Sequence, residues 1–150
     1  MGVGLRKTIF LTAEAHVYER EGDYERAIRC YEEMKQYEKV KEMFAKLAGK
    51  HHQKALETGS ENEFQLAFDN YAKSDRVDLL VQLIADHTIF TGNLSVMQTY
   101  FKRLHKLIDN EESKEKTVSL IIEALAKQNK SEGLVKLLMQ EFVETVHKSL

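Results

Sequence analysis

The sequence YEREGDYERAIRCYEEM, residues 18–34, decides the fold of this 150-residue chain. Its centre, Gly22-Asp23, stands between two segments rich in helix-forming residues. Glycine tolerates the left-handed conformation that ends many helices, and an aspartate side chain can cap the first turn of the next helix. The stretch therefore predicts two helices joined by a tight turn rather than a site that carries chemistry.

Helical periodicity continues through the rest of the chain, and sustained strand alternation is hard to find. Proline, which breaks helix interiors, is absent from all 150 residues. Connections between the predicted helices are short, so neighbouring helices are expected to form antiparallel hairpins. Eight helices are expected, at about residues 7–21, 24–35, 37–58, 61–73, 74–90, 94–108, 109–128 and 131–148, with an interruption allowed at Gly49.

Capping residues mark several of these helix starts. Ser60 and Glu63 have the S-x-x-E spacing of a capping box, in which each side chain satisfies a free backbone N–H of the other residue. Asp109 and Glu112 repeat this spacing before the seventh helix, and Asn93 is expected to cap the sixth.

Apolar positions recur at two regular offsets along the chain. Spacings of 3 and 4 mark any amphipathic helix, but the same set returns after 13 and again after 40 residues, which predicts a repeat built of helix pairs. Small Ala27 and Ala67 are equivalent in this register and would let two helix backbones approach closely. The sets are Tyr24, Ala27, Tyr31 and Met34; Tyr37, Val40, Phe44 and Leu47; Phe64, Ala67, Tyr71 and Ser74; Val77, Leu80, Ile84 and His87; and Met97, Tyr100, Leu104 and Leu107.

The first hairpin resembles the tetratricopeptide signature, which has a large apolar, a small and an aromatic residue, then Gly-x-aromatic at the turn, then alanine and a closing aromatic. The matching residues are Leu11, Ala15, Tyr18, Gly22, Tyr24, Ala27 and Tyr31. The family usually has tryptophan where this chain has Leu11, glycine at Ala15 and alanine at Met34. The match covers residues 8–34 well and residues 50–74 poorly. Residues 22–44 are also similar to the helical arms of intraflagellar-transport and vesicle-coat subunits.

The resemblance implies an all-α, right-handed α-solenoid of about four antiparallel helix hairpins, forming one domain over residues 1–150. It also implies a non-catalytic scaffold or oligomerisation module that binds a protein partner as a peptide or helix. In tetratricopeptide domains the first helix of each pair lines the groove. The partner-binding residues carried over from the matched hairpin are Thr12, His16, Glu19 and Arg20, which the pattern makes polar and exposed.

The last predicted helix has a broad apolar stripe that includes Leu134, Leu138 and Phe142. A terminal helix of a solenoid packs on one neighbour only, so the stripe could meet a second copy, a further repeat or a partner. A homodimer through this helix is one of these expectations. The remaining alternative is a wide inward face in a compact bundle.

A nucleic-acid-associated module is the alternative function. The segment YFKRLHKL, residues 100–107, combines Lys102, Arg103 and Lys106 with aromatic rings, and phosphates need cations while exposed bases stack on rings. The rings fall on or beside an apolar stripe and are better explained as core. The net charge of −2 supplies no field that would attract nucleic acid.

No catalytic, cofactor-binding or metal-ligating set emerges from the sequence, so we do not expect an enzyme. A phosphate-binding G-x-x-x-x-G-K-[ST] loop is missing. Adjacent His51 and His52 would point about 100° apart on a helix, so they are expected to be solvated rather than to share an ion. Cys30 sits next to a packing aromatic and is expected to act as a small hydrophobe.

The sequence also indicates the cellular location of the protein. Residues 1–16 lack the pattern of a signal peptide, and no apolar run approaches the ~20 residues of a membrane span. A single cysteine allows no disulfide within the chain. We therefore expect a cytoplasmic protein without membrane insertion.

Overall fold

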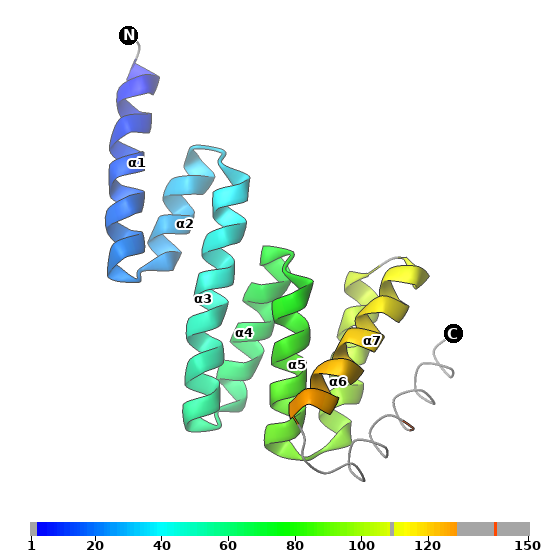
Figure 1. Cartoon of the computed structure of the whole chain (residues 1–150). Helices are drawn as coiled ribbons and strands as arrows, with labels where there is room; N and C mark the ends of the chain where they lie inside the picture. Colours follow the sequence, from blue (N-terminus) through cyan, green and yellow to red (C-terminus); the bar gives the residue numbers. More distant parts are fainter. Residues whose placement is uncertain (1–2, 109, 129–139, 141–150) are drawn as a thin grey trace. The chain divides into compact units, whose positions relative to one another are not determined.

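The computed structural model describes residues 3–108, 110–128 and 140, and the secondary structure in them is helical throughout (Figure 1). The predicted all-α class is therefore confirmed. The expected eighth helix, residues 131–148, falls outside the described residues except at Gln140. The helices α1 to α7 are Val3–Glu21, Tyr24–Glu33, Tyr37–Thr58, Glu61–Ser74, Val77–Thr91, Leu94–Leu107 and Glu111–Gln128.

The chain divides into two compact units, residues 1–76 and residues 77–150, which we name unit 1 and unit 2. In unit 1, α1 packs against α2, α2 against α3, and α3 against α4. In unit 2, α5 packs against both α6 and α7. The single domain expected over residues 1–150 stays a prediction.

The turn at the centre of the deciding stretch has the predicted geometry. Gly22 is left-handed, with φ of 77°, and the carboxylate of Asp23 accepts a hydrogen bond from the backbone N–H of Arg26. Asn93 caps α6 in the same way, because its side-chain oxygen accepts from the N–H of Ser95. These caps satisfy backbone donors that a helix start leaves without partners.

Other predicted boundaries were wrong. Helix α1 begins at Val3, earlier than expected, and α3 passes through Gly49 without interruption. Ser74 ends α4 instead of opening α5, because its hydroxyl donates to the carbonyl of Tyr71 and accepts from the N–H of Arg76. Asp75 is left-handed, with φ of 59°.

The start of α7 also differs from the expected capping box. Asn110 takes the capping role there, because its side-chain oxygen lies 2.8 Å from the N–H nitrogen of Glu112. Asp109, the residue predicted for this role, lies outside the described residues.

The buried positions of the chain follow the repeat register closely but not completely. Ala27 and Ala67, the small residues expected where two helix backbones approach closely, are both fully buried, and so is Ala15. The first positions of two sets, Tyr37 and Val77, and the last position of another, Leu107, are instead exposed by 61%, 40% and 52%. The buried cluster consists of Ala15, Ala27, Ile28, Cys30, Tyr31, Val40, Met43 and Leu47.

Unit 2 has a core of its own in which polar side chains are included. His87 is fully buried, and its Nδ1 is hydrogen bonded to the hydroxyl of Tyr100. The buried hydroxyl of Thr88 donates to the carbonyl of Ile84 on the preceding turn. Because each group has a partner, the burial of these polar atoms does not leave them unsatisfied. The apolar part includes Leu83, Ile84, Met97, Phe101, Leu104, Ile121 and Leu125.

Candidate functional site

A groove in unit 1, with a volume of about 390 Å³, is the candidate functional site. Helices α2 and α4 form its walls, and α3, against which both of them pack, forms its floor. We name this hollow the α2–α4 groove. Its lining residues are Glu25, Ile28, Arg29 and Glu32 from α2; Phe44, Leu47 and His51 from α3; and Leu66, Asp69, Asn70 and Lys73 from α4.

Each of the three helices lines the groove with residues from one of its faces. The lining of α2 runs from Glu25 to Glu32 and that of α4 from Leu66 to Lys73, each at i, i+3, i+4 and i+7. The floor residues on α3 follow i, i+3 and i+7. Residues at these separations lie in a line along a helix, so each wall of the groove is about two helical turns long.

Two of the three floor residues, Phe44 and Leu47, are apolar, while the rim of the groove carries charges of both signs. Leu47 is buried in the core and Phe44 is half-buried, so the aromatic ring is partly accessible from the groove. The ammonium of Lys73 lies 5.3 Å from the centroid of that ring, within the range of a cation–π contact. On the opposite wall, exposed Arg29 stands between Glu25 and Glu32.

His51 ties the floor of the groove to α4, which corrects the expectation of a solvated histidine. Its Nδ1 lies 2.5 Å from Oε2 of Glu63, and the two side chains are only 23% and 12% exposed. This hydrogen bond lowers the pKa of the Glu63 carboxyl, against the opposing effect of burial, and Lys54 at 3.5 Å lowers it further. His52 is likewise bonded, with its Nδ1 3.0 Å from the hydroxyl of Tyr71.

Cys30 behaves as predicted, as a small buried residue. It is 6% exposed and belongs to the core cluster of the first three helices. Burial raises the pKa of its thiol, and the negative charges of Glu14 and Glu33 add to this effect. A raised pKa disfavours the thiolate that nucleophilic chemistry needs.

None of the four partner-binding residues predicted on α1 lines the α2–α4 groove. His16 and Arg20 are exposed, as the pattern indicated. Thr12 and Glu19 are half-buried, which the pattern did not indicate. The Thr12 hydroxyl donates to the carbonyl of Thr8 at 2.8 Å.

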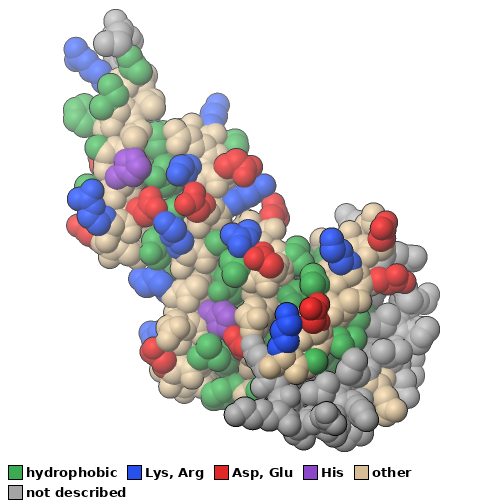
Figure 2. Space-filling view, viewed as in Figure 1, with side chains coloured by type: hydrophobic (Ala, Val, Ile, Leu, Met, Phe, Trp, Pro, Cys, Tyr) green, Lys and Arg blue, Asp and Glu red, His purple; other side chains and the backbone are tan. Residues whose placement is uncertain are grey.

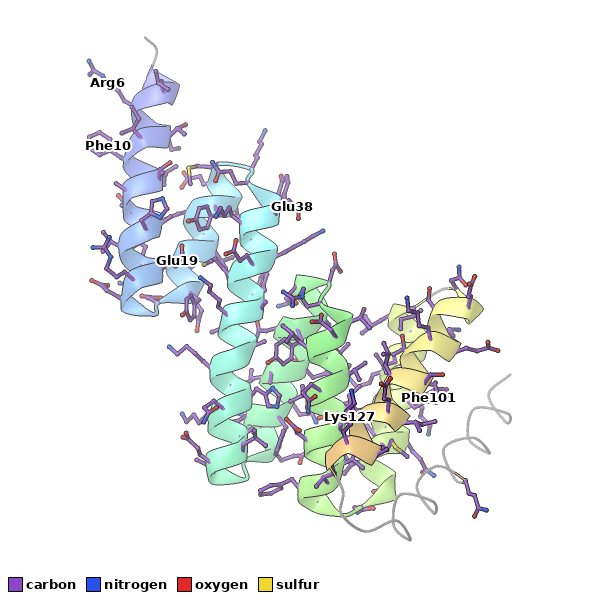
Figure 3. The ribbon with its side chains drawn as sticks, in the orientation of Figure 1. Arg6, Phe10, Glu19, Glu38, Phe101 and Lys127 are labelled. Carbon is purple, nitrogen blue, oxygen red and sulfur yellow. The ribbon has the colours of Figure 1, made fainter. Side chains whose placement is uncertain are left out.

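Glu19 faces the neighbouring helices rather than solvent (Figure 3). It accepts hydrogen bonds from the Tyr31 hydroxyl at 3.3 Å and from Lys46 Nζ at 2.7 Å. Its carboxylate is therefore used within unit 1, where it joins α1 to α2 and α3.

The groove residues were missed because the resemblance directed attention to the first helix of the hairpin. A signal for them was present in the sequence. Residues 25–32 and residues 66–73 each have three polar side chains and one apolar side chain at helical spacing, on a face next to the repeat register. The sequence does not show that these two polar stripes face each other, because that depends on both helices packing against α3.

The segment considered for nucleic acid has its aromatic rings in the core. Tyr100 and Phe101 are 1% and 4% exposed, so neither ring offers a face on which a base could stack. Lys102 and Lys106 are exposed and Arg103 is half-buried. Leu134, Leu138 and Phe142, predicted as a terminal apolar stripe and a dimer contact, lie outside the described residues.

The described part of the chain has neither a cluster of metal ligands nor a membrane-spanning helix. Among residues 3–108, 110–128 and 140, no three His, Cys, Asp or Glu side chains are placed so that they could hold a metal ion. The same residues include no helix with both the length and the apolar character needed to cross a bilayer. Compared with known proteins, the chain matches no family model, no curated protein and no solved structure.

Proposed function

We propose that this chain is a non-catalytic, tetratricopeptide-like scaffold that binds an amphipathic helix of a partner protein in the α2–α4 groove. The observation that carries the proposal is the arrangement of the lining, in which a floor with apolar Phe44 and Leu47 lies between two walls with helical spacing. Helix-in-groove recognition uses anchors at i, i+3, i+4 and i+7, and walls of the same period fit such anchors. The repeat register and the signature of the first hairpin support the same class of function.

The rim of the groove indicates what the partner helix should carry. Glu25 and Glu32 flank Arg29 on one wall, while Asp69 and Lys73 stand on the other. A partner helix with apolar anchors and charges of both signs beside them would complement these walls. Such charges set register and orientation more than they set affinity. The lone, buried thiol of Cys30 agrees with the cytoplasmic location that we propose with this function.

Photo-crosslinking tests the groove directly. A benzophenone amino acid placed at Leu66, which lines the groove, should capture a partner from cell extract. The matched position is Leu56 on α3, which is 41% exposed and does not line the groove. We expect mass spectrometry to identify proteins linked at position 66 and missing at position 56. Equal capture at both positions would contradict the proposal.

A binding measurement with the captured segment then tests the role of the floor. Phe44→Ala should weaken binding about tenfold or more, since aromatic anchors in grooves are frequent hot spots. Leu56→Ala is the control and should leave the affinity unchanged. Circular dichroism should show equal helix content in both variants, because Phe44 is only half-buried. Unchanged affinity in the folded Phe44→Ala protein would rule out the groove as the binding site.

A further inference from the structure

Helix α1 has a second apolar face, which does not take part in the core. The core side of this helix consists of Leu11, Ala15 and Tyr18. Nine large hydrophobic residues are exposed in the described part of the chain, and four of them are on α1: Leu5 at 45%, Ile9 at 59%, Phe10 at 67% and Val17 at 49%. Figure 2 shows hydrophobic side chains at the surface of this helix. Scattered exposed leucines are normal, but a concentration on one helix is not.

Three of these four residues, Ile9, Phe10 and Val17, belong to a line of exposed side chains along the helix. We name it the outer face and define it by Arg6, Ile9, Phe10, Ala13, Val17 and Arg20. Arg6, Phe10, Ala13, Val17 and Arg20 follow one another at three or four residues, and Ile9 lies three residues after Arg6 and four before Ala13, so all six lie on one side of the helix. Figure 3 shows Arg6 and Phe10 pointing away from α2. The outer face shares no residue with the α2–α4 groove, so it is a separate surface of unit 1.

The two ends of the outer face carry positive charges that have no ion-pair partner among the described residues. These are Arg6 and Arg20, both of them exposed. Other charges of α1 are paired with neighbouring helices: Lys7 lies 2.9 Å from Glu33 on α2, and Glu19 lies 2.7 Å from Lys46 on α3. The arginines are fourteen residues apart, which corresponds to about 21 Å along a helix.

We propose that the outer face binds an amphipathic helix of another protein whose apolar stripe ends in two carboxylates about 21 Å apart. Each carboxylate would pair with one guanidinium, which suits arginine because its planar donors match a carboxylate in two-bonded geometry. Phe10 and Val17 would supply the apolar anchors, and small Ala13 at the centre lets the partner's backbone come close. This surface is additional to the groove of the proposed function.

A second copy of this chain fits the outer face poorly. An antiparallel pair of α1 helices centred on Ala13 would place Ile9 opposite Val17 of the other copy. The same arrangement places Arg6 opposite Arg20 at both ends, and a parallel pair places each arginine against itself. Like charges brought together at an interface oppose association, so a partner with acidic ends is favoured over self-association.

An anionic membrane fits poorly as well. Glu14 and Glu21 lie four residues after Phe10 and Val17, so they border the outer face along its length. A bilayer surface would bring negative headgroups against both carboxylates. The net charge of the whole chain is −2, which adds no attraction to such a surface.

Two designed helical peptides provide the test. Both carry four leucines in one stripe and a fluorescein label. One has glutamates at the two ends of the stripe, fourteen residues apart, and the other has lysines there. Fluorescence anisotropy with the full chain at low ionic strength should show the glutamate peptide binding about tenfold more tightly. The double variant Arg6→Glu, Arg20→Glu should reverse this order.

Variants of the apolar anchors complete the design. Phe10→Ser should weaken both peptides, while Phe90→Ser on α5, at a residue that is 52% exposed, is the matched control and should weaken neither. Val17→Ser gives the same readout if Phe10→Ser reduces the helix content seen by circular dichroism. Phe44→Ala in the groove should leave the affinity ratio of the two peptides unchanged, which separates this surface from the groove.

Four outcomes would overturn the proposal. The first is equal affinity for the two peptides, and the second is an affinity ratio that the double arginine variant does not change. The third is a dimer in light scattering that Phe10→Ser dissolves, which would make a second copy the occupant. The fourth is co-sedimentation with vesicles of phosphatidylserine and phosphatidylcholine that Phe10→Ser prevents, which would make the occupant a membrane.

Discussion

Glu19 is the residue at which the first three helices of the chain are joined. It extends from α1 to the hydroxyl of Tyr31 on α2 and to the ammonium of Lys46 on α3. The hydrogen bond from Lys46 lowers the pKa of the Glu19 carboxyl, although burial acts in the opposite direction. The same cluster raises the pKa of Tyr31, chiefly through burial and then through the charge of Glu19. One carboxylate thus orients side chains from two neighbouring helices.

Glu19→Gln should make the protein less stable at neutral pH but not in acid. Because the folded pKa of this carboxyl lies below its ordinary value of 4.5, its ionised form stabilises the fold above that pH. That stabilisation is lost as the pH falls through the folded pKa. Lys46 is 41% exposed, so solvent screening limits the expected loss to about 0.5–1 kcal/mol at pH 7.

Urea unfolding followed by circular dichroism at about pH 7 and about pH 3 measures this difference. Glu14→Gln is the matched control on the same helix, since Glu14 is exposed and makes no hydrogen bond or ion pair within the described residues. It should have little effect at either pH. A loss in Glu19→Gln that is equally large in acid would show that the charge of this carboxylate is not responsible.

For Glu63, the contact within its own helix start was predictable from the sequence, but its contact with another helix was not. The Ser60 hydroxyl accepts from the N–H of Glu63 at 3.4 Å, as the S-x-x-E spacing predicts. The reciprocal bond of the capping box is replaced, because the Glu63 carboxylate pairs with His51 and the N–H of Ser60 donates to Thr58 Oγ1. The bond between Ser60 and Glu63 is set by two residues that are three apart in the sequence. The pair of Glu63 with His51 depends instead on which helix packs against α4.

At the scale of helices, two glycines with opposite roles can be compared. Gly22 ends α1 with a left-handed φ of 77°. Gly49 lies inside α3, where an added Cβ would meet no atom within 4 Å. The first glycine meets a backbone requirement, and the second only weakens a helix.

Replacement of each glycine by alanine should therefore change stability in opposite directions. Gly22→Ala should lower the free energy of unfolding by about 1–2 kcal/mol, because a Cβ disfavours the left-handed region. Gly49→Ala should raise it by about 0.5–1 kcal/mol, because alanine is the better helix former. Urea unfolding of the two variants beside the parent protein measures both changes. Destabilisation by both substitutions would contradict this account of Gly49.

The helix boundaries that were predicted correctly are those set by residues close to them in the sequence. Caps such as Asp23, Ser60 and Asn93 act within three residues, and each has the predicted role. The exposure of Tyr37 and Val77 was not predictable, because it depends on whether another element covers the first turn of α3 or α5. The α2–α4 groove was missed for the same reason, since its walls come from helices separated by α3.

At the scale of the whole molecule, the absence of proline and the continuous helical periodicity were sufficient to predict an all-α protein. The division into unit 1 and unit 2 was not visible in composition, because no linker-like segment separates residues 1–76 from residues 77–150. The arrangement of hairpins as a right-handed solenoid stays a prediction. It depends on small rotations between successive hairpins that local sequence patterns do not encode.

Unit 1 should fold when residues 1–76 are expressed alone. It has its own core, and α4 adds the fully or nearly fully buried Phe64, Ala67 and Phe68. The fragment should show a helical circular dichroism spectrum and one cooperative urea transition, with a stability of a few kcal/mol at most. Residues 1–60, which lack α4, should lose this cooperativity because α3 is left uncovered. A non-cooperative transition in residues 1–76 would contradict the independence of the unit.

The burial of Cys30 has a practical consequence for following motion in this protein. It is the only cysteine in the chain, and it lies in the cluster that joins α1, α2 and α3. An alkylating reagent can reach the thiol only when that cluster opens, so the labelling rate of the native protein reports the free energy of local opening. The labelling rate of Cys30 is therefore a probe of local opening in the wild-type chain. Gly22→Ala should raise this rate, whereas Gly49→Ala should lower it.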